Sequence, residues 1–195
     1  MIEKKFDSRN LQKLNDPQRL VDIPPDYIWE KLNIKEPGVI VDIGAGTGFF
    51  SLALLQKSKS SKIYACDSSE VMINWIRENI SPEHPGIIPV KTEEHYIPLD
   101  DRIADLVFMI NLHHELDNPA MTIEESKRIL KPEGKIFIVD WKKKEMPEGP
   151  PVEIRYLPER VKEQLEDAGF KKVDIHHDLQ KHFLIIGEKD RLYSI

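Results

Sequence analysis

The sequence predicts an α/β protein with a mostly parallel sheet covered by helices on both faces. Short β-branched runs alternate with longer segments that carry apolar residues at helical spacing, which is the pattern of strand–helix–strand units. The run Val39–Ile43 leads into a glycine-rich turn and then a helix. The last two runs follow one another with no helix between them, only Leu179–Lys181, which predicts an antiparallel hairpin at the end of the sheet.

Each element is predicted from its own pattern. Residues up to about Ile34 carry short helical signals around Ser8–Leu14 and Pro25–Leu32. The last predicted helix has Val161 and Leu165 on one face, and Gly169 follows it as a C-terminal glycine should. Strands are expected at residues 38–43, 62–66, 87–91, 105–110, 134–140, 172–178 and 182–188, and the main helices at 47–57, 69–79, 119–130 and 158–168.

Length and composition indicate one domain. A chain of 195 residues buries about 70% of its unfolded surface and needs no disulfide bonds or metal ions to stabilise its fold. The single cysteine, Cys66, excludes an internal disulfide framework and favours a reducing compartment. Met1–Lys5 lacks the apolar core of a signal peptide, and no apolar run reaches membrane-spanning length. We therefore expect a cytoplasmic single domain, 1–195, with an N-terminal helical cap (1–35), a core (36–188) and a lid or substrate loop (142–158).

The charge pattern argues against a nucleic-acid partner. The net charge is −6, and the one basic cluster, Lys142–Lys144, is followed at once by Glu145. A nucleic-acid-binding domain normally presents a larger basic face. We expect no metal site, because the sequence has no HExxH or similar ligand spacing. The sequence does not decide between a monomer and a homodimer.

The turn after the first strand carries Gly44, Gly46 and Gly48. Glycine tolerates positive φ and lets a ligand approach the backbone, and the start of the following helix offers free N–H donors. The spacing is GxGxG, not the GxGxxG of dinucleotide sites, and the carboxylate of Asp42 precedes the turn. A pyrophosphate does not suit this carboxylate, whereas a ligand with a cationic amino acid end does. The alternative is a tight turn without a ligand.

This turn resembles the first motif, (D/E)xGxGxG, of class I S-adenosylmethionine-dependent methyltransferases. Asp42 and the three glycines match it position for position. Ile97–Asp101 with the strand after it resembles the family's LPxxDxxFD passage, and Ile129–Gly134 its LKPGG turn, with Glu133 in place of the first glycine. The resemblance spans about residues 36–188 and is strongest to the type 11, ubiquinone/menaquinone-biosynthesis-like branch. It implies a Rossmann-like three-layer α/β/α sandwich with strand order 3-2-1-4-5-7-6 and strand 7 antiparallel.

The resemblance also implies how S-adenosylmethionine is held. Asp67, at the end of the second strand, takes the place of the residue that binds the ribose hydroxyls; its alternative role is to cap the next helix. Met72 lines the adenine pocket or belongs to the ordinary core. Glu93, or Glu94 one residue later, accepts a hydrogen bond from the adenine amino group. The expected cofactor-binding residues are Asp42, Gly44, Ala45, Gly46, Gly48, Asp67, Ser68, Met72, Glu93, Glu94 and Asn111.

The acceptor side is expected just past the fourth strand. The resemblance makes His113 and His114 candidate general bases, since an imidazole can take a proton at neutral pH; their alternative role is architectural. Glu115, Asp140 and Arg155 are candidate substrate contacts. Asp140 could instead cap the exit from its strand, and Arg155 could pair with an acidic residue across the cleft.

The predicted function is transfer of a methyl group from S-adenosylmethionine to a small quinol-, lipid- or metabolite-like acceptor, with S-adenosylhomocysteine as the product. Alignment of the reacting groups accounts for much of the rate in such a displacement. Two alternatives stay open: a non-catalytic S-adenosylmethionine-binding partner of another methyltransferase, and a nicotinamide oxidoreductase. The position of the third glycine disfavours the oxidoreductase.

Overall fold

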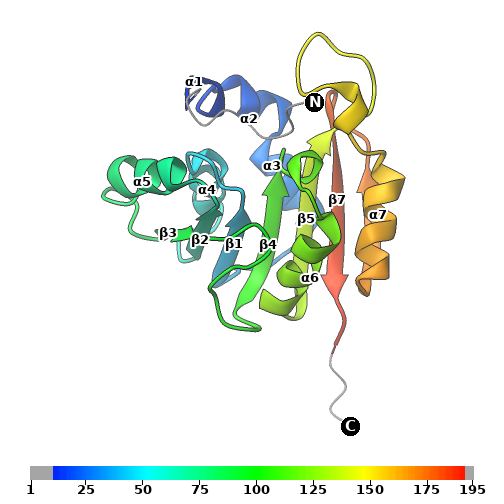
Figure 1. Ribbon diagram of the computed structural model, residues 1–195. Helices are drawn as coiled ribbons and strands as arrows, with labels where there is room; N and C mark the ends of the chain where they lie inside the picture. The colour runs from blue at the N-terminus through cyan, green and yellow to red at the C-terminus, as the bar shows by residue number, and fades with distance from the viewer. Residues whose placement is uncertain (1–10, 192–195) are drawn as a thin grey trace.

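A computed structural model describes residues 11–191 and contains one seven-stranded sheet with the order β3-β2-β1-β4-β5-β7-β6 (Figure 1). The strands β1 to β5 run parallel, and β7 is antiparallel to both β5 and β6. The predicted fold and strand order are therefore confirmed. The strands are β1 Val39–Ile43, β2 Lys62–Asp67, β3 Ile87–Lys91, β4 Ala104–Ile110, β5 Leu130–Trp141, β6 Phe170–His176 and β7 His182–Lys189.

Two strands differ by two residues or more from the bounds that the sequence predicts. β5 begins at Leu130 rather than at 134, because Leu130 already pairs with Ala104 before the register shifts. Glu133 then takes a left-handed φ of 62° at the position where the resembled turn has glycine. β6 begins at Phe170, directly after Gly169, whose φ is 84°. The predicted strand at 172–178 thus lies two residues further toward the N-terminus.

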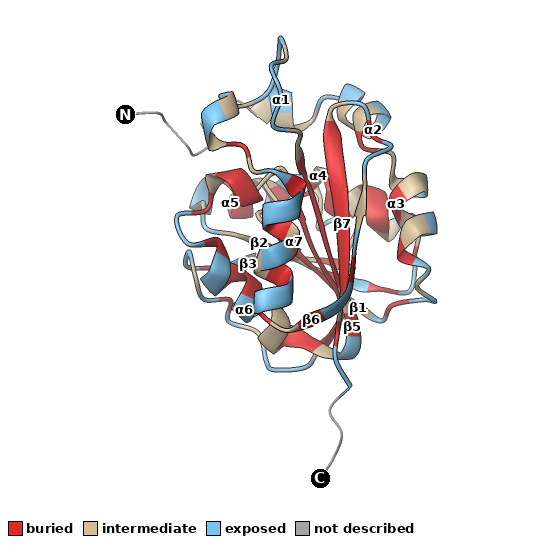
Figure 2. Cartoon of the chain, turned by 90° about the vertical axis from the view of Figure 1, so that its right-hand side faces the viewer, coloured by how far each residue is buried: buried red, intermediate tan, exposed pale blue. Residues whose placement is uncertain are grey.

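The helices form two layers, one on each face of the sheet. One buried cluster joins Ile28 of α3, Leu54 of α4 and Ile76 of α5 to one face, and the other joins Ile123 of α6 and Val161 of α7 to the opposite face. Figure 2 shows the buried strands between these helices, whose outer sides are exposed. The helices are α1 Leu11–Leu14, α2 Gln18–Asp22, α3 Pro25–Leu32, α4 Phe49–Leu55, α5 Glu70–Asn79, α6 Pro119–Ile129 and α7 Pro158–Asp167, with short 3-10 turns η1 His113–Glu115 and η2 Val152–Ile154.

The N-terminal segment lies at the edge of the sheet where the parallel strands end. Figure 1 shows α1, α2 and the loop before η2 on this side of the molecule. The side chain of Leu14 lies beside Gly46, and the Thr47 hydroxyl donates to the Asn15 side-chain oxygen at 2.9 Å. Of the signal predicted around Ser8–Leu14, residues 8–10 lie outside the described part of the chain. α2 was not expected from the sequence.

Candidate active site

A cavity of about 850 Å³ opens at this edge, between the turn after β1, the loops after β2 to β5 and the N-terminal helices. Its position agrees with the rule that ligands of open α/β sheets bind beyond the carboxyl ends of the strands. Gly48, His113, Asp140 and Arg155 do not line the cavity. The sequence-predicted residues that do line it are Asp42, Gly44, Ala45, Gly46, Asp67, Ser68, Met72, Glu93, Glu94, Asn111, His114 and Glu115.

The glycine turn is held in a left-handed conformation against β2. Gly44, Gly46 and Gly48 have φ values of 72°, 55° and 76°. The N–H groups of Gly44 and Ala45 donate to the Cys66 carbonyl at 2.9 and 3.0 Å. A Cβ at Gly44 would stand 2.7 Å from the end of the Leu112 side chain, which would have to shift, and the φ of 72° strains any residue other than glycine. Gly48 instead caps α4 and faces Ile76, where it allows close packing of the helices.

Asp67 links the turn to the next helix. Its two carboxylate oxygens accept hydrogen bonds from the Gly46 N–H and the Ser69 N–H, each at 2.8 Å. Burial raises the pKa of Asp67 above its usual value, against these hydrogen bonds. Each oxygen keeps a second lone pair. Ser69 is the N-cap residue of α5 and no side chain caps this helix, so Asp67 is not its cap. The carboxylate keeps the capacity to accept hydroxyl donors from the cavity.

A carboxylate, Asp42, and a guanidinium, Arg19, both line the glycine-turn end of the cavity. Asp42 is buried, accepts a hydrogen bond from the Ser51 hydroxyl at 2.6 Å, and has its pKa raised to about 7 by burial. Arg19 of α2 lies over the Phe50 ring, 4.7 Å from its centroid. Burial lowers the pKa of Arg19 to about 10 although Asp42 and Asp16 favour its charged form, so Arg19 stays cationic at neutral pH.

This pair suits both ends of a zwitterionic amino acid. The Arg19 guanidinium offers donors to a carboxylate, and the Asp42 region offers acceptors to an ammonium. Sequence reasoning missed Arg19, because the short α2 has no apolar periodicity and comes before the motifs. The only signal in this segment of the sequence is Arg19 itself, a cation in the last turn of α2, which lies between two prolines.

His114 and Asp140 form a buried pair at the wall of the cavity. The imidazole Nδ1 lies 2.7 Å from one Asp140 oxygen, and the His114 backbone N–H donates to the other at 2.9 Å. Burial lowers the pKa of His114, but the hydrogen bond and charge of Asp140 outweigh it and raise this pKa above 6.5. The pKa of Asp140 is held below its usual value, because His114 outweighs the effect of burial. The other ring nitrogen, Nε2, lies 3.7 Å from Glu115 Oε1, and both residues line the cavity.

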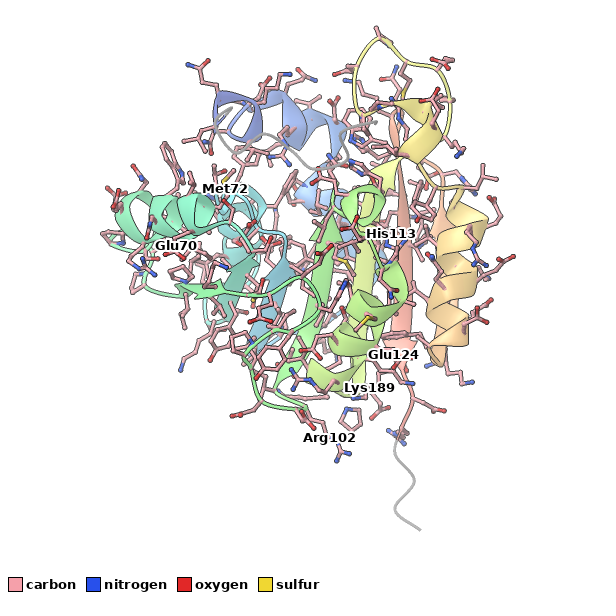
Figure 3. The ribbon with its side chains drawn as sticks, in the orientation of Figure 1. Glu70, Met72, Arg102, His113, Glu124 and Lys189 are labelled. Atoms are coloured by element: carbon pink, nitrogen blue, oxygen red, sulfur yellow. The ribbon has the colours of Figure 1, made fainter. Side chains whose placement is uncertain are left out.

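His113 faces away from the cavity into the protein. It is fully buried, its Nε2 lies 2.8 Å from the Gln164 side-chain oxygen, and its ring meets Tyr156 edge to face at 5.0 Å. Burial lowers the pKa of His113. Figure 3 shows His113 at the start of η1, near α6, whereas Met72 reaches from α5 toward the N-terminal helices. The two neighbouring histidines therefore have different surroundings.

Arg155 holds the loop of residues 142–158 together through hydrogen bonds within the loop. Its guanidinium donates five hydrogen bonds to the backbone carbonyls of Lys142, Lys144, Glu148 and Pro150, and it is 4% exposed. An arginine has five N–H donors, so this set occupies them all. The structure thus places Arg155 inside the loop, and Arg155 does not line the cavity. Other residues of the same loop do line the cavity: Glu148, Gly149, Pro150 and Pro151.

The far end of the cavity lies between the β3–β4 loop and α6. Glu93 and Glu94 follow β3 and are exposed at its rim. Arg128 pairs with both Glu125 oxygens and donates to the Ile97 and Leu99 carbonyls, which holds the loop against α6. Asn111, at the end of β4, has a φ of 56°, and its buried side-chain oxygen has no hydrogen-bond partner among residues 11–191.

The described residues hold neither a metal-binding cluster nor a membrane-spanning helix. No cluster of three or more histidine, cysteine, aspartate or glutamate residues within 11–191 has a metal-binding arrangement. None of the described helices is long and apolar enough to cross a membrane.

The sheet order, the left-handed glycine turn between two acidic residues and the cavity above it define the class of S-adenosylmethionine-dependent methyltransferases. The chain belongs to the methyltransferase family: residues 41–138 match the family model described as a methyltransferase domain. A crystal structure of a SAM-dependent methyltransferase from Aquifex aeolicus is similar over 94% of this chain and 99% of that chain, with 36% identity and a TM-score of 0.87.

Two curated relatives differ in the reaction that their names state. A ubiquinone/menaquinone biosynthesis C-methyltransferase from Chromobacterium violaceum is 24% identical over 77% of this chain and 76% of its own length. A malonyl-[acyl-carrier protein] O-methyltransferase from Geobacter sulfurreducens is 31% identical over 51% of this chain and 37% of its own length. The chain therefore spans well under half of the second relative. One named enzyme methylates carbon and the other oxygen, so the family alone does not define the acceptor.

Proposed function

We propose that this chain transfers the methyl group of S-adenosylmethionine to a small-molecule acceptor bound under the loop of residues 142–158. In this proposal the acceptor end of the cavity lies beyond His114, where Trp141 and Pro150 form its wall. The loop, held together by the hydrogen bonds of Arg155, covers the acceptor, and the N-terminal helices cover the cofactor. We place the reaction in the cytoplasm, because the sequence has one cysteine and that cysteine is buried.

The cofactor is assigned to the opposite end. Asp67 accepts from the ribose hydroxyls, and Glu93 or Glu94 accepts from the adenine amino group. Arg19 and Asp42 would bind the carboxylate and the ammonium of the methionyl part. The cofactor supplies a methyl group on positively charged sulfur, ready for in-line displacement. Holding the acceptor atom in line with it is the main contribution of the protein.

The observation that carries a chemical role for His114 is its pairing with Asp140. Asp140 accepts from Nδ1, which leaves Nε2 as the nitrogen that can take a proton on the cavity side. In the proposed reaction Nε2 removes the proton of the acceptor while the methyl group moves to the acceptor atom. Asp140 stabilises the imidazolium that forms, as a buried carboxylate does beside a catalytic histidine. S-adenosylhomocysteine and the methylated product then leave.

A methyl-transfer screen with quinols, catechols, fatty acids and small amines tests the proposal, together with calorimetry of S-adenosylmethionine, S-adenosylhomocysteine and NAD. We expect both sulfur nucleosides to bind and at least one acceptor class to be methylated. Binding of NAD alone would overturn the proposal. Binding of the cofactor with no methylation of any acceptor would favour a regulatory partner.

His114→Ala and His113→Ala then separate the roles of the two histidines. A lost general base costs about 10²–10⁴-fold in rate. We expect this loss for His114→Ala, with cofactor affinity preserved. His113→Ala serves as the neighbouring control, and its effect should fall on stability. Equal turnover of His114→Ala and the wild type on the identified acceptor would remove the proposed base.

A further inference from the structure

We propose that His182 recognises the acceptor and that the recognised group is an uncharged hydroxyl on an otherwise apolar molecule. This inference rests on the proposed function, because it assigns the substrate class of the same cavity. From its sequence context we interpret His182 as an ordinary strand residue, and it is the first residue of the last strand.

The inference is based on the buried imidazole of His182, which lies at the wall of the cavity and makes no hydrogen bond within residues 11–191. His182 is 1% exposed and lines the cavity, yet neither ring nitrogen has a partner among residues 11–191. A buried polar group left unsatisfied loses its hydrogen bonds to water without replacement, so native proteins rarely keep one without a reason. A ligand group that reaches the ring from the cavity would supply the missing hydrogen bond.

The ring is held in place by its neighbour across the sheet. His182 pairs with Trp141 in the antiparallel ladder of β5 and β7, and the two rings are 4.2 Å apart between centroids, tilted by 46°. Arg155 lies over the same indole at 5.6 Å. This stacking holds the imidazole at the junction of the sheet and the loop of residues 142–158, where the acceptor is proposed to bind.

The imidazole is neutral at physiological pH. Burial lowers the pKa of His182 to about 4, although Asp140 of β5 and Asp22 of α2 favour the charged form; Lys181 and Arg19 oppose it. A neutral imidazole has one N–H donor and one lone pair. A hydroxyl both donates and accepts, so it can bind whichever nitrogen faces the cavity in either tautomer.

The charged groups around His182 are already paired with one another, except Arg19, which is assigned to the cofactor. Lys181 bridges Asp22 at 2.8 Å and Glu148 at 2.7 Å, which joins α2 to the loop of residues 142–158. Asp140 is engaged by His114. A neutral imidazole among paired charges cannot compensate a buried ionic group, which costs far more to bury than a neutral one. An anionic or cationic head group next to His182 is therefore disfavoured.

Apart from Asp22 and Glu148, which line the cavity with their carboxylates paired to Lys181, several apolar side chains form this part of the wall. Ile23, Trp141, Pro150 and Pro151 line the cavity near the start of β7. Binding sites of this kind combine apolar walls with a few polar groups that set orientation. The expected acceptor has an apolar body that contacts these side chains and a hydroxyl that reaches His182. The atom that is methylated need not be this hydroxyl.

Phenol, benzylamine and benzoate test the inference, because they share a ring and differ in the charge of their polar group at neutral pH. The full chain is first saturated with S-adenosylhomocysteine, and binding of each probe is then measured by calorimetry and by the ring ¹⁵N signals of the histidines. We expect phenol to bind at least about tenfold more tightly than the two charged probes, and to shift the His182 signals but not those of His113. Tighter binding of either charged probe, no binding of any probe, or unchanged His182 signals would overturn the inference.

Variants assign the effect to the ring. His182→Leu should weaken phenol binding about tenfold, while His182→Gln, which keeps an amide near the ring nitrogens, should restore most of it. His176→Leu, on the neighbouring strand and outside the cavity, is the matched control. If His182→Leu fails to fold, the wild-type ¹⁵N shifts and His182→Gln still decide. Failure of the wild type to bind S-adenosylhomocysteine would contradict the proposed function instead, and normal cofactor binding with equal phenol affinity in His182→Leu would contradict the inference alone.

Discussion

Asp140→Asn is expected to lower the free energy of unfolding by an amount that depends on pH. The Asp140 carboxylate accepts three hydrogen bonds, from His114 Nδ1 at 2.7 Å, from the His114 N–H at 2.9 Å and from the Trp141 N–H at 2.7 Å. An asparagine has one acceptor oxygen, so its amide nitrogen must face at least one of these donors. Because Asp140 is 2% exposed, loss of its charge leaves the buried His114 imidazolium with only the more distant Glu115 carboxylate, 3.7 Å from Nε2. Breaking a buried pair in this way costs about 3–5 kcal/mol.

The sign of the pH dependence follows from the two shifted groups. The pKa of His114 is raised in the folded state, so its contribution is complete below its unfolded pKa and is lost as the pH rises through the folded one. The pKa of Asp140 is lowered, so its contribution is complete above its unfolded pKa and is lost only in acid. The pair therefore stabilises the fold most between about pH 4 and about pH 6.5.

Chemical denaturation at about pH 5.5 and about pH 9 measures this effect. We expect the difference between the wild type and Asp140→Asn to be larger at the lower pH. Asp105→Asn is the matched control, since Asp105 accepts from the Gly38 and Val39 N–H groups and pairs with Lys131, without a histidine. Its effect should be equal at the two pH values. An equal effect of Asp140→Asn at both would refute the proposed charge state of the pair.

Three further substitutions test the turn, the loop and the base of the sheet. Gly44→Ala puts a methyl group 2.7 Å from Leu112 at a φ of 72°, so calorimetry should show S-adenosylhomocysteine binding weakened by at least about tenfold, whereas Gly38→Ala, whose nearest contact is 3.5 Å, should bind normally. Arg155→Met removes the five hydrogen bonds within its loop; we expect faster proteolysis there with cofactor affinity unchanged, and a resistant loop would contradict this. Lys189→Met leaves two carbonyls without their buried ammonium donor, far from the cavity (Figure 3), and should cost about 1–3 kcal/mol of stability with normal cofactor binding.

The local pattern of the sequence was sufficient for the core of the fold. Periodicity identifies strands and helices, because each element has one face that must be buried. The glycine turn could be predicted from the sequence because its left-handed φ values, and the close approach of Leu112 to Gly44, favour glycine over other residues at these positions. Its match to a known motif then supplied the strand order, which local propensity alone does not specify.

Only the tertiary structure decided which polar side chains meet the cavity. His113 and His114 are neighbours in the sequence, but successive residues of a 3-10 turn point about a third of a turn apart, so one faces Gln164 and the other faces the cavity. Arg155 is a candidate substrate contact from the sequence, whereas the structure shows that carbonyls of its own loop occupy its donors. His182 carried no local signal and Arg19 only that of a lone cation between two prolines, since their roles depend on chain segments far away in the sequence. Long-range packing sets their partners, their burial and therefore their charge.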